Sequence, residues 1–230
     1  MLSELIDLVP LPDILAIIWL VVWWSGYAAI NCNPQTNRRE LARVIDGYRH
    51  RWMERMLERD NRMADVNIII AHIRSGALFA STTVLILAGI VALWGNVDRL
   101  IVMIDELAFS TLASRQLIEL KVLTMMAIFA YGFFKFAWCL RQYNTALVVI
   151  GAAPLPAECD DETRTQYPAR AASILTRAAG NFNRGLNAYY FGLATLAWFI
   201  QPVLFMVAVL LVIVVLYRRD RHSVTLKALS

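Results

Sequence analysis

One uncharged stretch decides the fold: residues 75–94 read SGALFASTTVLILAGIVALW. A helix needs about twenty mostly apolar residues to cross the roughly 30 Å hydrocarbon core of a bilayer. This stretch provides that length without a single Asp, Glu, Lys or Arg. It therefore predicts a membrane-spanning helix, and the rest of the chain is interpreted around it.

The composition of the whole chain agrees with a membrane location. Of the 230 residues, 59% are hydrophobic and only 17% are charged, a balance unusual for a water-exposed globular surface. The net charge of +4 comes almost wholly from arginine, and no nucleic-acid motif accompanies the arginines. We therefore expect contact with the lipid bilayer and with anionic lipids at its cytoplasmic face, and none with nucleic acid.

Further apolar segments predict a single all-α membrane domain, a helical bundle with four spans. The spans are predicted at about 13–32, 75–94, 121–140 and 188–217. Two of them leave alternatives open. The third span either ends near Leu140 or continues as a helix through Ile150. The last is either one tilted helix, kinked at Pro202, or two shorter pieces.

Two segments between the spans predict helices outside the hydrocarbon. In residues 36–70, apolar side chains recur every three, four or seven positions, and arginines interleaved with acids occupy the other faces. This pattern is typical of a long amphipathic helix, here predicted to be cytoplasmic. In residues 169–184 a second apolar stripe is accompanied by Arg170, Arg177 and Arg184, which recur every seven residues.

The basic residues indicate an orientation. Residues 33–74 contain nine of them and 141–187 contain five, whereas 1–12 contain none and 95–120 contain two. Because basic connections stay in the cytoplasm, we expect the N-terminus outside and loop 33–74 inside, in a bacterial inner (plasma) membrane. Four spans then put the basic C-terminal tail outside, which conflicts with the same rule. A re-entrant last segment would return the tail to the inside.

Signatures of enzymes are missing from the sequence. It contains no HExxH, GxSxG, P-loop or GxGxxG motif, and its three histidines are scattered. We therefore expect no enzymatic activity, with no catalytic residue, no metal site and no cofactor.

Polar residues near the ends of the third and fourth spans are the candidate ligand or pore residues, because such groups are unexpected inside lipid. They either line a hydrated path that favours anions or form hydrogen bonds that fix helix packing. The candidates are Lys135, Arg141, Asn144, Arg184, Asn187 and Gln201. For helix packing, we select Gly76 and Ala80, because small side chains four residues apart let two helix backbones approach.

Three segments of the chain resemble one family. They are Arg49 to Met53 (RHRWM), Leu140 to Asn144 (LRQYN), and Asn187 to Phe191 (NAYYF), which is followed by Trp198 and Pro202. These segments are similar to an uncharacterised multi-spanning membrane-protein family of bacteria and plants, known only as a domain of unknown function. The resemblance covers nearly the whole chain and implies a membrane location. It identifies no catalytic or transport residue.

Two classes of function follow from these observations. The leading hypothesis is an oligomeric pore or carrier for a small anion, in which Lys135, Arg141 and Arg184 attract the solute. Since four spans rarely enclose a conduit, this hypothesis requires a homo-oligomer. The alternative is a non-transporting structural or accessory membrane protein that binds anionic lipid or a partner subunit.

Overall fold

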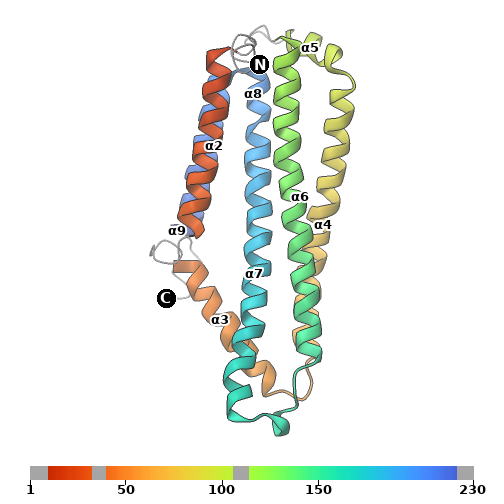
Figure 1. Cartoon of the computed structure of the whole chain (residues 1–230), viewed down its shortest axis with the longest axis vertical. Helices are drawn as coiled ribbons and strands as arrows, with labels where there is room; N and C mark the ends of the chain where they lie inside the picture. Colours follow the sequence, from red (N-terminus) through yellow and green to blue (C-terminus); the bar gives the residue numbers. More distant parts are fainter. Residues whose placement is uncertain (1–9, 33–39, 106–113, 222–230) are drawn as a thin grey trace, which may run out of the picture. The chain divides into compact units, whose positions relative to one another are not determined.

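A computed structural model of the chain describes residues 10–32, 40–105 and 114–221, and these residues are all-α (Figure 1). The elements are α2 (Leu11–Cys32), α3 (Glu40–Leu57), α4 (Met63–Trp94), α5 (Val97–Asp105), α6 (Arg115–Gly151), a short 3-10 helix η1 (Pro156–Glu158), α7 (Asp161–Ala194), α8 (Leu196–Ile200) and α9 (Pro202–Arg221). The predicted fold class is confirmed.

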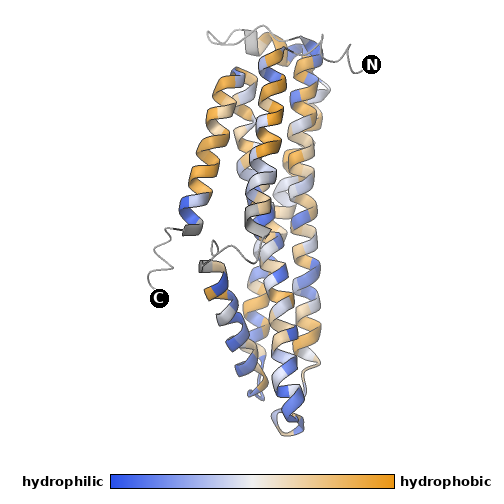
Figure 2. Cartoon of the chain, turned by 60° about the vertical axis from the view of Figure 1, so that its left-hand side comes forward, coloured by the Kyte–Doolittle hydropathy of each residue, from blue (hydrophilic) through white to orange (hydrophobic). Residues whose placement is uncertain are grey.

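Four helices within these ranges are long and apolar enough to cross a membrane. Their spanning segments are Leu11–Ala29 of α2, Met63–Trp94 of α4, Arg115–Gly151 of α6 and Pro202–Arg219 of α9. Large apolar side chains on them face outward; Leu85 is 73% exposed and Phe134 is 67% exposed. Figure 2 shows the hydrophobic colour over most of α9, while α3 is largely hydrophilic. The chain is a multi-spanning integral membrane protein in contact with the lipid bilayer.

The described residues form two compact units. Unit 1 consists of residues up to 40, residues 85–130 and residues from 187 through the end of α9; unit 2 consists of residues 41–84 and 131–186. Helices α4, α6 and α7 each contribute one part to each unit.

In unit 1, the end of α7 is the central element. Lys121 of α6 contacts Trp198, whereas Phe129, further along α6, contacts Gly192, so α6 and α7 are antiparallel. Buried Ala188, Phe191 and Trp198 pack with α2 and α9. A second apolar cluster joins the end of α4 to α5 and the start of α6.

Of the two alternatives for the last apolar segment, the structure has the shorter pieces and not one kinked helix, because the chain reverses near Gln201. Helix α7 continues to Ala194, α8 ends at Ile200, and Gln201 is extended, with φ −159° and ψ 138°. The cause is Pro202: a proline disfavours helical backbone at the residue before it and lacks the N–H that would extend α8. Helix α9 then packs against α2, and both start at the end of unit 1 where α8 lies (Figure 1).

In unit 2, the predicted amphipathic helix at 36–70 is two helices. Helix α3 ends at Leu57 and α4 begins at Met63; residues 36–39 lie outside the described residues. The intervening residues 58–62, ERDNR, include no apolar side chain, and Asn61 Oδ1 accepts a hydrogen bond from the Met63 backbone N–H at 3.0 Å. This turn lets buried apolar residues of α3 pack in one cluster with Ile69 of α4.

Helices α6 and α7 are longer than the predicted segments. Of the two placements of the third span, the structure has the continuous helix through Ile150, because α6 runs unbroken for 37 residues. At 1.5 Å per residue α6 is about 55 Å long, well beyond the hydrocarbon thickness. The predicted helix at 169–184 is not separate, since it lies inside the 34-residue α7.

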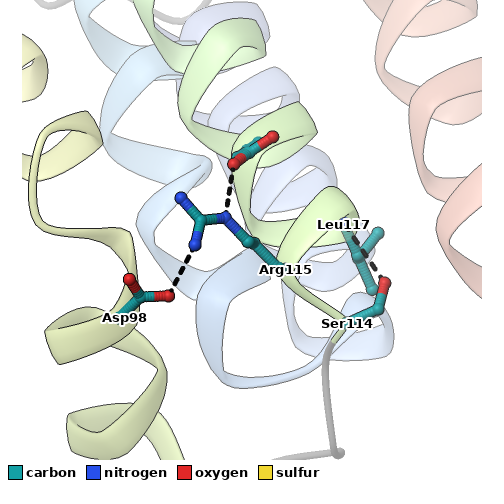
Figure 3. Close-up of polar contacts among 5 residues, drawn as sticks. Asp98, Ser114, Arg115 and Leu117 are labelled. Carbon is teal, nitrogen blue, oxygen red and sulfur yellow. Dashed lines mark hydrogen bonds and ion pairs between the residues drawn. The ribbon is translucent and has the colours of Figure 1, made fainter.

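The start of α6 is fixed by exposed polar contacts (Figure 3). Ser114 Oγ accepts a hydrogen bond from the Leu117 backbone N–H at 3.3 Å, which caps the helix. The Arg115 guanidinium forms ion pairs with Asp98 of α5 at 2.9 Å and with Glu119 at 3.0 Å. The Arg115 side chain is 57% exposed, and exposed pairs of this kind contribute at most about 1 kcal/mol each.

A tight helix contact in unit 2 leads to a first prediction. A Cβ atom at Gly185 of α7 would lie 2.6 Å from the ring of Phe136, which is fully buried in α6. Replacing Gly185 with alanine is expected to lower the free energy of unfolding by about 1–3 kcal/mol, because the ring has no space to move into. The thermal midpoint in mild detergent measures this loss.

The matched control is Gly180→Ala in the same helix. Nothing lies within 4 Å of a Cβ atom at that position. Alanine there is expected to raise the midpoint slightly, because alanine favours helix over glycine by about 0.5–1 kcal/mol. Equal midpoints for the two variants would contradict the packing argument.

Candidate functional site

A buried ion pair in unit 1 is formed by residues from three helices. Asp13 of α2 and Lys121 of α6 are only 3% and 2% exposed, and Asp13 Oδ1 lies 3.3 Å from Lys121 Nζ. Trp198 of α8 donates a hydrogen bond from Nε1 to Asp13 Oδ1 at 2.8 Å. The Trp198 carbonyl oxygen accepts a hydrogen bond from Lys121 Nζ at 2.9 Å. We call these residues the Asp13–Lys121–Trp198 cluster.

The sequence explains why the Trp198 carbonyl oxygen has no backbone donor. In a continuous helix this oxygen would accept a hydrogen bond from the backbone N–H four residues later. That residue is Pro202, which has no N–H. Lys121 therefore provides the donor that the proline lacks. The cluster joins α2, α6 and α8 and leaves neither charge of the pair uncompensated, so its arrangement favours a structural role over proton transfer.

The predicted ligand or pore residues in unit 2 lie mostly on the surface. Arg141 and Asn144 are exposed on α6, and the Arg141 guanidinium lies 5.4 Å from the centre of the Trp138 ring. Arg184 of α7 is also exposed. Lys135 is half-buried, with Nζ 5.1 Å from the centre of the Tyr131 ring.

Two bridging amides connect part of this set. Asn181 Nδ2 donates a hydrogen bond to Gln142 Oε1 at 2.8 Å, and the Arg184 guanidinium donates one to Asn181 Oδ1 at 3.4 Å. Asn181 thereby links Arg184 of α7 to Gln142 of α6, the residue next to Arg141. In this hydrogen-bonded set Asn181 is the buried member.

The two remaining candidates belong to unit 1. Gln201 is exposed at the break between α8 and α9. Asn187 is half-buried, and its Oδ1 atom is buried without a hydrogen-bond partner. Of the residues selected for helix packing, Gly76 is buried, and a Cβ atom there would lie 2.9 Å from Leu140 Cδ2 of α6; Ala80 is half-buried.

A surface groove at α3 is lined by three arginine side chains and two aromatic ones. Its volume is 230 Å³, and its lining residues are Tyr48, Arg51, Trp52, Arg55 and Arg59. Tyr48, Arg51, Trp52 and Arg55 recur at intervals of three and four residues, which places them along one face of α3, and Arg59 lies just after the helix ends. We call this surface the α3 groove. Sequence reasoning noted these arginines but did not select them as a site.

One side of the α3 groove is held by a buried carboxylate. Asp65 of α4 is fully buried, and its Oδ1 atom accepts hydrogen bonds from Trp52 Nε1 at 2.6 Å and from the Arg59 guanidinium at 2.8 Å. Its Oδ2 atom has no hydrogen-bond partner. These contacts fix two of the five lining side chains against α4.

The connection between α6 and α7 packs against the turn between α3 and α4. The Arg62 guanidinium donates hydrogen bonds to the carbonyl oxygens of Ala153 and Pro154. The Tyr167 hydroxyl donates one to the Val149 carbonyl at 2.6 Å, and burial raises the pKa of this phenol. Hydrogen bonds from Thr163 lower the pKa of Asp160, which caps the start of α7.

Within the described ranges, no group of three or more His, Cys, Asp or Glu residues is placed to hold a metal ion.

Comparison with known proteins gives one match. The sequence model of the family described as "Protein of unknown function, DUF599" matches residues 15–225, which is nearly the whole chain. No curated protein matches the chain, and no solved structure matches it. The matched range includes all the segments that suggested a family from the sequence.

Proposed function

This chain belongs to the DUF599 family of proteins of unknown function, and we propose that it is a non-transporting accessory membrane protein that binds an anionic lipid surface. One observation supports this proposal above the others. The buried charges of unit 1 are paired with each other, whereas Arg141 and Arg184 are exposed on the outside of unit 2. A conduit needs polar groups that face inward; a lipid-binding surface needs them outside.

The position of Arg141 along α6 supports contact with lipid headgroups. It follows Lys121 by twenty residues in the same helix, which corresponds to about 30 Å, one hydrocarbon thickness. A guanidinium there reaches the headgroups by extending along its own stem. Trp138 beneath it is typical of the aromatic residues at a membrane interface.

We place these arginines at the cytoplasmic face of a bacterial inner membrane, since basic segments stay on that side. The test compares nanodiscs of neutral lipid with nanodiscs containing anionic lipid. Anionic lipid is expected to raise the thermal midpoint of the protein by several degrees. The double variant Arg141→Gln/Arg184→Gln is expected to lose most of that increase, and high salt should reduce it for the unchanged protein.

The matched control is Arg115→Gln, which removes an exposed arginine at the start of α6. It is expected to keep the response to anionic lipid, because Arg115 is already paired with Asp98 and Glu119. An equal lipid response in the double variant and the unchanged protein would argue against the proposal.

An oligomeric pore or carrier for a small anion is the second candidate. It is supported by Arg141 and Asn144, which are three residues apart and both exposed on α6, where several copies of the chain could place them around an axis. It predicts anion flux in proteoliposomes that depends on Lys135, and a homo-oligomer in native mass spectrometry. Flux abolished by Lys135→Ala would favour the pore over the accessory role.

A further inference from the structure

The α3 groove carries an excess of positive charge. Arg59 is paired with Asp65, but neither Arg51 nor Arg55 has a carboxylate partner among the residues that the structure describes. Two acids of α3 that the structure describes are engaged with other groups: Asp46 pairs with Arg49 at 2.6 Å, and Glu54 lies 3.1 Å from His50. Two guanidiniums of the groove are therefore available to an anion.

The groove combines these guanidiniums with aromatic rings. The Arg51 guanidinium lies over the Tyr48 ring, 4.8 Å from its centre, which orients it without neutralising it. Trp52 is held in place by its hydrogen bond to Asp65. Arginine recognises phosphate through paired N–H donors, and Tyr and Trp offer an apolar body beside a polar tip. This set of side chains fits a phosphate that carries an apolar substituent.

The location of α3 near the membrane favours a lipid as the molecule that carries this phosphate. Helix α3 follows the membrane-spanning α2 after only seven residues, so the chain cannot carry its start more than about 30 Å from the point where α2 ends. A volume of 230 Å³ suits a single headgroup rather than a polymer. We propose that the α3 groove binds the phosphate headgroup of one anionic phospholipid.

This inference rests on the proposed lipid-binding role but makes a separate claim, namely one discrete site. The test is native mass spectrometry of the full chain released from micelles that contain phosphatidylglycerol or phosphatidylcholine. The protein is expected to retain one phosphatidylglycerol molecule and no phosphatidylcholine. The double variant Arg51→Gln/Arg55→Gln is expected to bind phosphatidylglycerol at least about tenfold more weakly, because two charge-assisted hydrogen-bonding groups are removed.

The charge-matched control is Arg170→Gln/Arg177→Gln on α7, which removes two exposed arginines outside the groove. It should retain the lipid, and thermal midpoints should confirm that both double variants are folded. Retention of the lipid by the groove variant would overturn the inference. Displacement of the bound lipid by millimolar glycerol phosphate alone would also overturn it, because the ligand would then be a soluble phosphate.

The two proposals fail in different ways. If the groove variant keeps its bound lipid while the Arg141→Gln/Arg184→Gln variant loses its stabilisation by anionic lipid, the accessory role stands and the α3 site is excluded. If neither variant changes any lipid response, both proposals are excluded. Loss of the single bound lipid only in the groove variant supports the discrete site.

Discussion

Replacing Lys121 with methionine is expected to lower the free energy of unfolding by about 3–5 kcal/mol, because the Asp13 carboxylate would remain buried without its counter-charge. The size of the effect follows from burial, since both side chains are almost inaccessible. The variant also removes the donor to the Trp198 carbonyl, which Pro202 leaves without a backbone partner. Thermal or denaturant unfolding in mild detergent measures the loss.

The double variant Asp13→Leu/Lys121→Met separates charge from packing. It is expected to recover part of the loss, because only the polar groups of Trp198 then lack partners. Arg115→Gln, which breaks the exposed pairs of Figure 3, should cost less than about 1 kcal/mol. If the double variant were less stable than Lys121→Met alone, the ion pair could not be the source of the effect.

A cysteine at Arg218 is expected to react with a membrane-impermeant reagent from the same side as one at Arg43, and a cysteine at Asn96 only from the opposite side. The reason is the direction of the helices in unit 1. Helices α2 and α9 both start at the end that contains Trp198, and α4 ends there, beside the start of α6. The labelling is done in intact cells and in inverted vesicles, in a background without native cysteines.

This orientation places Arg218 and Arg219, at the end of α9, on the side of loop 33–74, as the distribution of arginine requires. The conflict that four simple spans create in the sequence is thereby removed. Residues 222–230 of the tail lie outside the described residues, so the labelled site is Arg218, at the end of α9. Reaction of Arg218→Cys from the side of Asn96 would contradict this orientation. It would support the four-span arrangement predicted from the sequence, in which the C-terminal tail is outside.

The spans were predictable where the sequence is uncharged. Residues 75–94 lie in α4, and the uncharged residues 122–134 lie in α6, because an uninterrupted apolar run has no stable alternative to a helix inside lipid. The ends of these helices were not predictable in the same way. Beyond the hydrocarbon, helical periodicity continues across the turn at 58–62, and the packing of α3 on α4 adds to the local hydrogen bond of Asn61 in ending one helix and starting the next.

The buried cluster could not be found from the sequence, because Trp198 is separated from Asp13 by 185 positions and from Lys121 by 77. No periodicity relates such distant residues. The one local signal is Pro202, four residues after Trp198, because a proline has no N–H to donate to the Trp198 carbonyl oxygen. Arg141 and Arg184 differ from this cluster, because the sequence already marks them as unusual charges in an apolar region. Only the fold shows that they are exposed on the surface of unit 2.

The long separation of Asp13 from Trp198 also governs the order of biosynthesis. At roughly 5–20 residues per second, a ribosome needs about 10–40 s to reach Trp198 after it has made Asp13. Throughout this time the Asp13 carboxylate of the nascent α2 lacks the indole N–H that donates to it in the folded protein. The buried contact between α2 and α8 therefore forms only after α8 has been made, and the last two helices complete the packing of unit 1.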